Sequence, residues 1–181
     1  MIKNILAFII MSASLTAYAS DFQLTSASIV PGKEIDMSHV LNALGCKGQN
    51  ISPQLSWNHA PSGTKSFAVT MYDPDALAEK GWWHWIVFNI PASSNGLDQD
   101  AGNPRSGKLP AGAVQGQNDF GAMEYGGPCP PSGDKPHRYV ITVYALKNTL
   151  PVDANVSITS VNRAIKQYEI AAASITTRYH R

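Results

Sequence analysis

Two apolar, β-rich runs, residues 67–72 and 86–90, constrain the fold of this chain more than any other feature. Each run has the composition of a buried strand. The connection between them is short, which favours an antiparallel hairpin, and a hairpin returns the chain to the sheet edge that it left. We therefore expect Asp73, Asp75 and His84, at the two ends of the connection, to meet at one edge of a sheet.

The clearest strand of the second half is predicted at residues 139–146. Strand alternation places His137 and Tyr139 on one face, side by side where this strand begins. If the strand neighbours the hairpin, its start lies at the same edge as Asp73 and His84. The sequence does not determine that adjacency.

The rest of the chain predicts short strands, one long polar loop at residues 93–112 and one late helix. Ser160 is expected to cap a helix over residues 161–172, which carries one apolar stripe. Fourteen glycines, 12 prolines and a charged fraction of only 15% suit many strands joined by turns. These features indicate a mainly β fold, a sandwich with a C-terminal helix. Its further strands are expected at residues 22–26, 54–57, 113–116 and 174–179.

The first 19 residues have the three parts of a secretory signal. Lys3 precedes an apolar segment at residues 5–11, and the small-residue pattern Ala17-Tyr18-Ala19 predicts cleavage after Ala19. The apolar segment is shorter than the roughly 20 residues that a membrane span requires. We therefore expect residues 20–181 to form a single exported domain, periplasmic or secreted, without stable membrane insertion.

Charge argues against a nucleic-acid partner. The chain has 14 Lys and Arg, 13 Asp and Glu, and a formal net charge of +1. Removal of the signal also removes Lys3, so the mature domain is close to neutral. A nucleic-acid surface needs a basic patch, which this balance does not favour.

Cys46 and Cys129 lie far apart in turn-like surroundings. In an oxidising compartment an even number of cysteines favours a disulfide, and two free thiols are the alternative. A bridge would tie residues 50–53 to the glycine- and proline-rich loop before His137. For so long a loop, the chain-entropy model gives an upper value of roughly 4 to 5 kcal/mol of stabilisation.

The residues expected at the sheet edge, two imidazoles with a carboxylate behind each of them, suit a receptor for a small anion. A carboxylate behind an imidazole fixes the tautomer and raises the pKa, so that the other ring nitrogen can donate to a phosphate or carboxylate oxygen. Free N–H groups around Gly126 and Gly127 would add partial positive charge. The simpler alternative is that Asp73 and Asp75 only shape the turn around Pro74 while the tryptophans fill the core.

Other chemistries have weaker support in the sequence. Two histidines and a carboxylate can bind a metal, but no His-x-x-x-His spacing is present, and we expect no metal and no cofactor. The Gly-x-Ser-x-Gly motif of serine hydrolases is also absent. His39 and His59 have no acidic or cysteine neighbours, and we interpret them as surface or internally satisfied histidines.

In combination, three motifs resemble the signature of the phosphatidylethanolamine-binding protein (PEBP) family, also called Raf kinase inhibitor-like proteins. They are Asp73-Pro74-Asp75, the tryptophan-rich approach to His84, and residues 127–131 leading to His137-Arg138-Tyr139. The resemblance covers nearly all of the predicted mature chain. The signal peptide and the cysteine pair are most similar to the exported proteins of its bacterial YbhB/YbcL-like branch.

The resemblance implies an antiparallel β-sandwich with a small pocket that accepts phosphate, phosphorylated head groups or similar acids. Together with the residues of the predicted edge, it gives eight expected ligand-binding residues: Asp73, Asp75, Trp83, His84, Gly127, Pro131, His137 and Tyr139. The sequence departs from eukaryotic relatives at residues 76–81, which lack a tyrosine that contacts the ligand, and at Cys129, where those relatives have glycine.

The function expected from these observations is non-enzymatic binding of a small anion by an exported protein, with modulation of protein partners. An enzyme that uses His84 and His137 as general acid and base is one alternative, acting on a phosphoryl or acyl substrate. The other alternative is a protein-interaction module whose pocket is vestigial. The sequence leaves the oligomeric state open, with a homodimer as one option.

Overall fold

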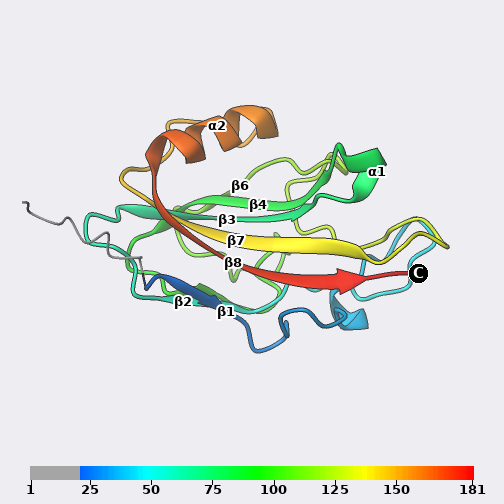
Figure 1. Cartoon of the computed structure of the whole chain (residues 1–181). Helices are drawn as coiled ribbons and strands as arrows, with labels where there is room; N and C mark the ends of the chain where they lie inside the picture. The colour runs from blue at the N-terminus through cyan, green and yellow to red at the C-terminus, as the bar shows by residue number, and fades with distance from the viewer. Residues whose placement is uncertain (1–20) are drawn as a thin grey trace, which may run out of the picture.

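The computed structural model describes residues 21–181, which form two antiparallel sheets and one long helix (Figure 1). The predicted signal at residues 1–19 lies outside this described part. The smaller sheet has the strand order β1 (Gln23–Thr25), β2 (Leu55–Asn58) and β5 (Gly96–Leu97). The larger sheet has the order β6 (Val114–Gln115), β4 (Trp82–Pro91), β3 (Ser66–Asp73), β7 (His137–Leu146) and β8 (Glu169–Tyr179).

The larger sheet is the centre of the molecule. One of its faces is covered by the smaller sheet and the other by helix α2 (Ile158–Tyr168), as Figure 1 shows. Two apolar cores result, one between the sheets and one under the helix. The alternation of side chains along β3, β4 and β7 supplies both cores, because successive residues point to opposite faces. The prediction of a β-sandwich with a C-terminal helix is confirmed.

The hairpin is confirmed, and its strands are longer than the sequence predicted. β3 and β4 pair antiparallel from Ser66 opposite Pro91 to Asp73 opposite Trp82. β7 pairs with the other side of β3. The strand that begins at His137 is therefore a direct neighbour of the hairpin, a point that the sequence left open. The connection between β3 and β4 contains a short helix, α1 (Ala76–Glu79), and a 3-10 turn, η1 (Met37–His39), lies in the earlier loop.

The predicted bounds of the C-terminal helix are wrong at both ends. Ser157, not Ser160, is the N-cap, and its side chain accepts a hydrogen bond from the Ser160 N–H. The helix ends at Tyr168, and β8 begins at Glu169 rather than at residue 174. Residues 169–173 are rich in alanine, which favours helix. Pairing with β7 along almost its whole length outweighs that local preference.

The disulfide prediction is confirmed. Cys46 and Cys129 are bonded, with their Cα atoms 6.0 Å apart and a separation of 83 positions in sequence. The bond joins the loop after η1 to the loop that leads into β7. Within residues 21–181, no helix has the length and apolar character needed to cross a membrane.

Candidate functional site

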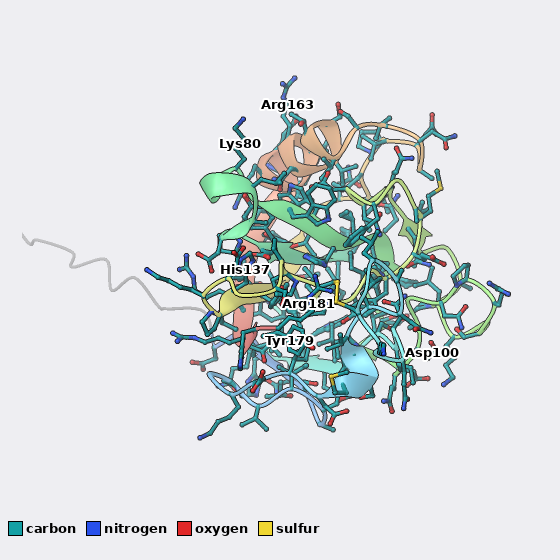
Figure 2. All side chains as sticks on the ribbon, turned by 90° about the vertical axis from the view of Figure 1, so that its right-hand side faces the viewer. Lys80, Asp100, His137, Arg163, Tyr179 and Arg181 are labelled. Carbon is teal, nitrogen blue, oxygen red and sulfur yellow. A yellow bond between two sulfur atoms is a disulfide. The ribbon has the colours of Figure 1, made fainter. Side chains whose placement is uncertain are left out.

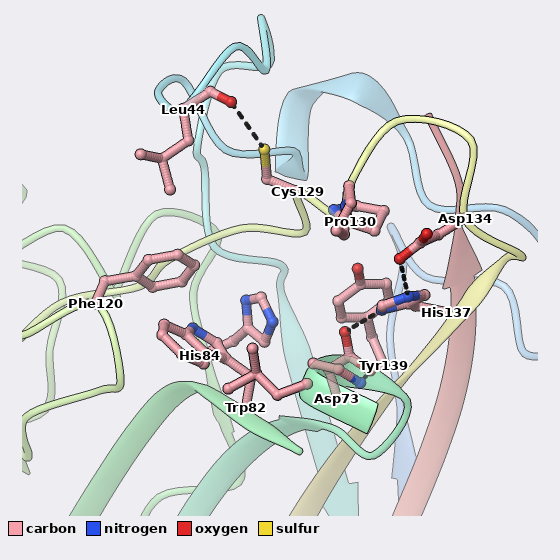
Figure 3. A pocket seen from close by; sticks show the side chains of 13 residues that line it. Leu44, Asp73, Trp82, His84, Phe120, Cys129, Pro130, Asp134, His137 and Tyr139 are labelled. Atoms are coloured by element: carbon pink, nitrogen blue, oxygen red, sulfur yellow. Dashed lines mark hydrogen bonds and ion pairs between the residues drawn. The ribbon is translucent and has the colours of Figure 1, made fainter. Parts of the chain in front are cut away.

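Three neighbouring strands meet at one edge of the larger sheet, and their terminal residues form the candidate site. β3 ends at Asp73, whereas its neighbours β4 and β7 begin at Trp82 and at His137, which Figure 2 labels. Because both pairings are antiparallel, the end of β3 lies beside the starts of the other two strands. Figure 3 shows the side chains of this edge around a pocket.

A β-bulge in β4 directs His84 into the pocket. Met71 pairs with Trp85, but the next residue, Tyr72, pairs with Trp83, so His84 is an extra residue on β4. A bulge of this kind re-aims the side chains around it. His84 therefore lines the pocket on the same face as the buried Trp85, while Trp83 turns to the opposite face and packs on the Tyr72 ring at 4.4 Å.

The buried Asp73 carboxylate has two separate roles. Its Oδ1 accepts hydrogen bonds from the backbone N–H groups of Asp75 at 2.8 Å and Ala76 at 3.2 Å, which holds the turn. Its Oδ2 accepts a hydrogen bond from Nδ1 of His137 at 2.8 Å. Asp73 is thus a turn former and also fixes the orientation of one imidazole.

His84 has a different partner from the one predicted. Its Nδ1 donates to the backbone carbonyl of Gly126 at 2.7 Å. Burial lowers the pKa of His84, and the bond to Gly126 and the negative charge of Asp73 oppose this effect. The prediction that a carboxylate stands behind each histidine is therefore wrong for His84. Its ring lies edge-on to Tyr139 at 5.2 Å and to Phe120 at 5.4 Å.

Two buried donors of the pocket have no partner. The Tyr139 hydroxyl and the Trp82 indole N–H are shielded from solvent and make no hydrogen bond within residues 21–181. Burial, and after it the negative charge of Asp73, raises the pKa of Tyr139, so the phenol keeps its proton. A buried donor left unpaired costs about 1 to 3 kcal/mol. A ligand that brings acceptor atoms would therefore recover a favourable contact at both groups.

The pocket combines these polar groups with an apolar rim. Its volume is about 200 Å³, and loops from three parts of the chain close it. The rim includes Leu44 and Leu77, which are 72% and 60% exposed. The disulfide ties the Leu44 loop to the wall formed by residues 129–131. The complete lining is Leu44, Asp73, Ala76, Leu77, Trp82, His84, Phe120, Cys129, Pro130, Pro131, Asp134, His137 and Tyr139.

Five of the eight predicted ligand-binding residues line this pocket: Asp73, His84, Pro131, His137 and Tyr139. Asp75 does not, because its carboxylate pairs with the guanidinium of Arg138 at 2.6 Å on the outer side of the turn. Hydrogen bonds from Arg138 lower the pKa of Asp75. Trp83 lies on the opposite face of the sheet, so the structure places neither Asp75 nor Trp83 in the lining.

Gly127 is also outside the lining and has a packing role. A Cβ atom at this position would lie 2.2 Å from the backbone oxygen of His39, so only glycine permits the close approach of the two loops. The expected nest of free N–H groups is wrong as well. The Gly126 N–H donates to the His84 carbonyl at 3.0 Å, and the Gly127 N–H donates to Oδ1 of Asn50 at 2.8 Å.

Several pocket residues were not predicted. Trp82 takes the place expected for Trp83, because the bulge shifts the alternation of β4. Phe120 and Asp134 come from irregular loops, where no periodicity indicates which side chains turn inward. Asp134 lies three residues before His137 and places its Oδ2 3.5 Å from the imidazole Nε2.

The remaining histidines of the early loops are separate from the pocket. His39 is buried, and its Nδ1 bonds the Ile51 carbonyl at 2.6 Å, so its interpretation as an internally satisfied histidine is confirmed. His59 is exposed in the connection after β2. Across the described residues, no group of three or more His, Cys, Asp or Glu side chains is arranged to hold a metal ion.

The fold and the site together define a class of protein: a two-sheet β-sandwich with one small pocket of oriented imidazoles and free donors at a sheet edge. Comparison with known proteins specifies that class. Residues 25–180 match the family model described as phosphatidylethanolamine-binding protein. The chain therefore belongs to the PEBP family.

Relatives in bacteria agree with this assignment. YbcL of Escherichia coli (strain K12) is 51% identical over 179 residues, which cover 98% of this chain and 96% of YbcL. YbhB of the same organism is 42% identical over 158 residues, covering 87% of this chain and 99% of YbhB.

Solved structures give the same result. The crystal structure of E. coli YbcL, described as a member of the mammalian PEBP family, superposes with a TM-score of 0.86 at 52% identity, covering 89% of this chain and 99% of that one. The PEBP homologue CT736 of Chlamydia trachomatis gives a TM-score of 0.74 at 30% identity, with coverage of 90% and 99%. The predicted resemblance to the PEBP family and its YbhB/YbcL-like branch is thus confirmed.

Proposed function

We propose that this protein binds a small anion, such as phosphate or a phosphorylated head group, in the pocket at the edge of β3, β4 and β7. The observation that carries the proposal is the pair of unpartnered buried donors, Tyr139 Oη and Trp82 Nε1, beside the imidazoles of His84 and His137. The oxygens of an anion are acceptors and would satisfy both donors.

The size of the pocket favours a small ligand. Pockets for drug-sized molecules have volumes of about 300 to 1,000 Å³, and this one has about 200 Å³. The donors are buried, whereas Leu44 and Leu77 of the lining are exposed and apolar. This arrangement suits a compact anionic group whose remaining part leaves the pocket past the Leu44 and Leu77 side chains.

We also propose that the protein is exported, acts without catalytic turnover and modulates protein partners. The signal pattern of residues 1–19 and the disulfide support export, because disulfides persist in oxidising compartments. Mass analysis of the protein from the periplasm and from the medium tests this part. A chain that retains Met1 in the cytoplasm would contradict it.

A hydrolase-type activity is the second candidate, because one feature favours it. The Asp73 carboxylate orients the His137 imidazole at 2.8 Å, as in pairs that act as general base. Turnover of phosphate esters or acyl esters by the purified protein, abolished in His84→Ala and in His137→Ala, would replace binding by catalysis as the function.

The binding proposal is tested by NMR of the mature, oxidised protein during titration with phosphate and then with phosphoethanolamine. We expect the imidazole resonances of His84 and His137 to shift together and to saturate. His39, His59 and His180 serve as internal controls, because none of them lines the pocket. Shifts that do not saturate, or that affect all five histidines equally, would contradict a specific site.

A double variant separates the pocket from the protein surface. If His84→Ala combined with His137→Ala removes anion binding but leaves partner affinity unchanged, partner recognition does not use the pocket. Loss of both would connect anion binding to partner modulation.

A further inference from the structure

The His137 imidazole lies between two carboxylates, one held in a short hydrogen bond and the other at a longer distance. On one side, Nδ1 donates to the buried Asp73 at 2.8 Å. On the other side, Nε2 faces Oδ2 of Asp134 at 3.5 Å, which is longer than an ordinary hydrogen bond. The Asp134 side chain is 49% exposed, whereas that of Asp73 is 3% exposed. Asp134 is therefore loosely held. It faces Nε2, the ring nitrogen of His137 that is not bonded to Asp73 and that an anion in the pocket could contact (Figure 3).

Asp134 also borders a second cavity. It lines both the pocket and an outer cleft of about 440 Å³, and the only other residue shared by the two linings is His137. The cleft is formed by Asp75, Asp134, Lys135, Pro136, His137, Arg138 and Arg178. Asp134 thus stands in the wall between an inner pocket with unpartnered donors and an outer cleft with three basic residues.

The outer cleft has positive charge that is not neutralised. Arg138 and Arg178 lie directly opposite each other in the pairing of β7 with β8, a like-charge arrangement that is unfavourable by itself. Arg138 is paired with Asp75. Arg178 forms no ion pair with a carboxylate of residues 21–181, and its neighbour across the strand bridge, Glu34, pairs with His180 at 3.0 Å. A carboxylate that enters the cleft would therefore meet Arg178 and Lys135.

We propose that Asp134 is an internal competitor for the anion site, and that a ligand binds by displacing its carboxylate from His137 toward Arg178 in the outer cleft. The proposal rests on the proposed anion binding and adds a determinant of specificity. The ligand must replace a tethered carboxylate, so a phosphate dianion is selected over a monocarboxylate of similar size. Arg178 favours the displaced position and acts on the ligand through Asp134, as a positioning residue.

The experiment compares the dissociation constants of phosphate and acetate for the wild type, Asp134→Asn, Arg178→Gln and the double variant. Asp134→Asn should tighten phosphate binding on the order of fivefold and acetate binding by more, so that the preference for phosphate decreases. Arg178→Gln should weaken phosphate binding in the wild type. Arg178→Gln should have no effect on phosphate binding in the Asp134→Asn background. There the displaced side chain at position 134 is uncharged, so Arg178 no longer attracts it.

Asp153→Asn is the matched control, since it changes net charge equally at a site outside both cavities. If Asp153→Asn tightens binding as much as Asp134→Asn, the effect is one of net charge and the proposal is overturned. It is also overturned if Asp134→Asn leaves phosphate binding unchanged or weaker, or if Arg178→Gln acts equally in both backgrounds. If neither the wild type nor Asp134→Asn binds phosphate, the proposed function fails together with the competitor.

Discussion

Asp73→Asn is the most informative single change in the pocket, because it separates the two roles of this side chain. Asparagine has the same shape and keeps one acceptor oxygen, which can still receive the backbone N–H groups of Asp75 and Ala76. Its amide nitrogen replaces the oxygen that accepts from Nδ1 of His137. The turn is preserved, and the charge-assisted bond that orients the imidazole is lost.

The expected magnitude follows from the burial of this pair. The His137 and Asp73 side chains are 8% and 3% exposed, so their hydrogen bond is little screened by water. A hydrogen bond to a charged group contributes about 1.5 to 3 kcal/mol. The Asn amide nitrogen can only donate, so Nδ1 becomes the acceptor of a neutral hydrogen bond in place of the charge-assisted one. We expect anion binding to weaken by about 1 to 3 kcal/mol, equivalent to roughly 5- to 150-fold in the dissociation constant.

Phosphate titration followed by ¹⁵N NMR of the histidine rings measures the affinity and the tautomer in one experiment. Asp75→Asn is the matched control, since it alters a carboxylate of the same turn that points away from the pocket toward Arg138. The control should bind phosphate with unchanged affinity. Unchanged affinity in Asp73→Asn, with His137 protonated at Nε2, would refute the reasoning and leave Asp73 as a turn former alone.

Three further predictions concern stability. Replacement of Cys46 and Cys129 by serine should lower the free energy of unfolding by up to roughly 4 to 5 kcal/mol, measured by urea denaturation, because the bond closes a loop across 83 positions. Because burial lowers the pKa of His84, the unfolded chain takes up a proton before the folded one as the pH falls below about 6.5. Stability should therefore decrease from pH 6.5 downward, and His84→Gln should reduce that slope in denaturation series. Tyr139→Phe removes a buried donor without a partner, so it should leave the unliganded protein equally stable or more stable by about 1 to 3 kcal/mol and should weaken phosphate binding. Lower stability of Tyr139→Phe without ligand would mean that the hydroxyl is already bonded.

The sequence predicted the parts of the fold that depend on local pattern. The strands at residues 67–72, 86–90 and 139–146 and the cysteine pair were found where expected, because apolar β-rich runs and an even cysteine count are local or compositional signals. The start of β8 was not predicted. Residues 169–173 favour helix by composition, and only their pairing with β7, a contact distant in sequence, makes them a strand.

The same distinction explains the candidate site. His137 and Tyr139 follow from simple alternation at the start of β7, and both line the pocket. The exchange of Trp82 for Trp83 follows from the bulge at His84, which depends on how β4 pairs with β3 and leaves no signature in the sequence. Asp134 was missed because it lies in an irregular loop, where only the folded chain shows which side chains approach His137.

The stability of the sandwich and the composition of the pocket are linked. Two unpartnered buried donors cost about 1 to 3 kcal/mol each, and the described structure keeps both at the edge of its most extensively paired strands. β3 is hydrogen-bonded on both sides, and the disulfide fixes the loop above it, so the donors cannot relax toward solvent without breaking the sheet or moving that loop. A rigid frame that holds unsatisfied donors is preorganised for an acceptor. A ligand that supplies acceptor oxygens would therefore raise the free energy of unfolding as its concentration exceeds the dissociation constant, and a ligand without acceptors would not.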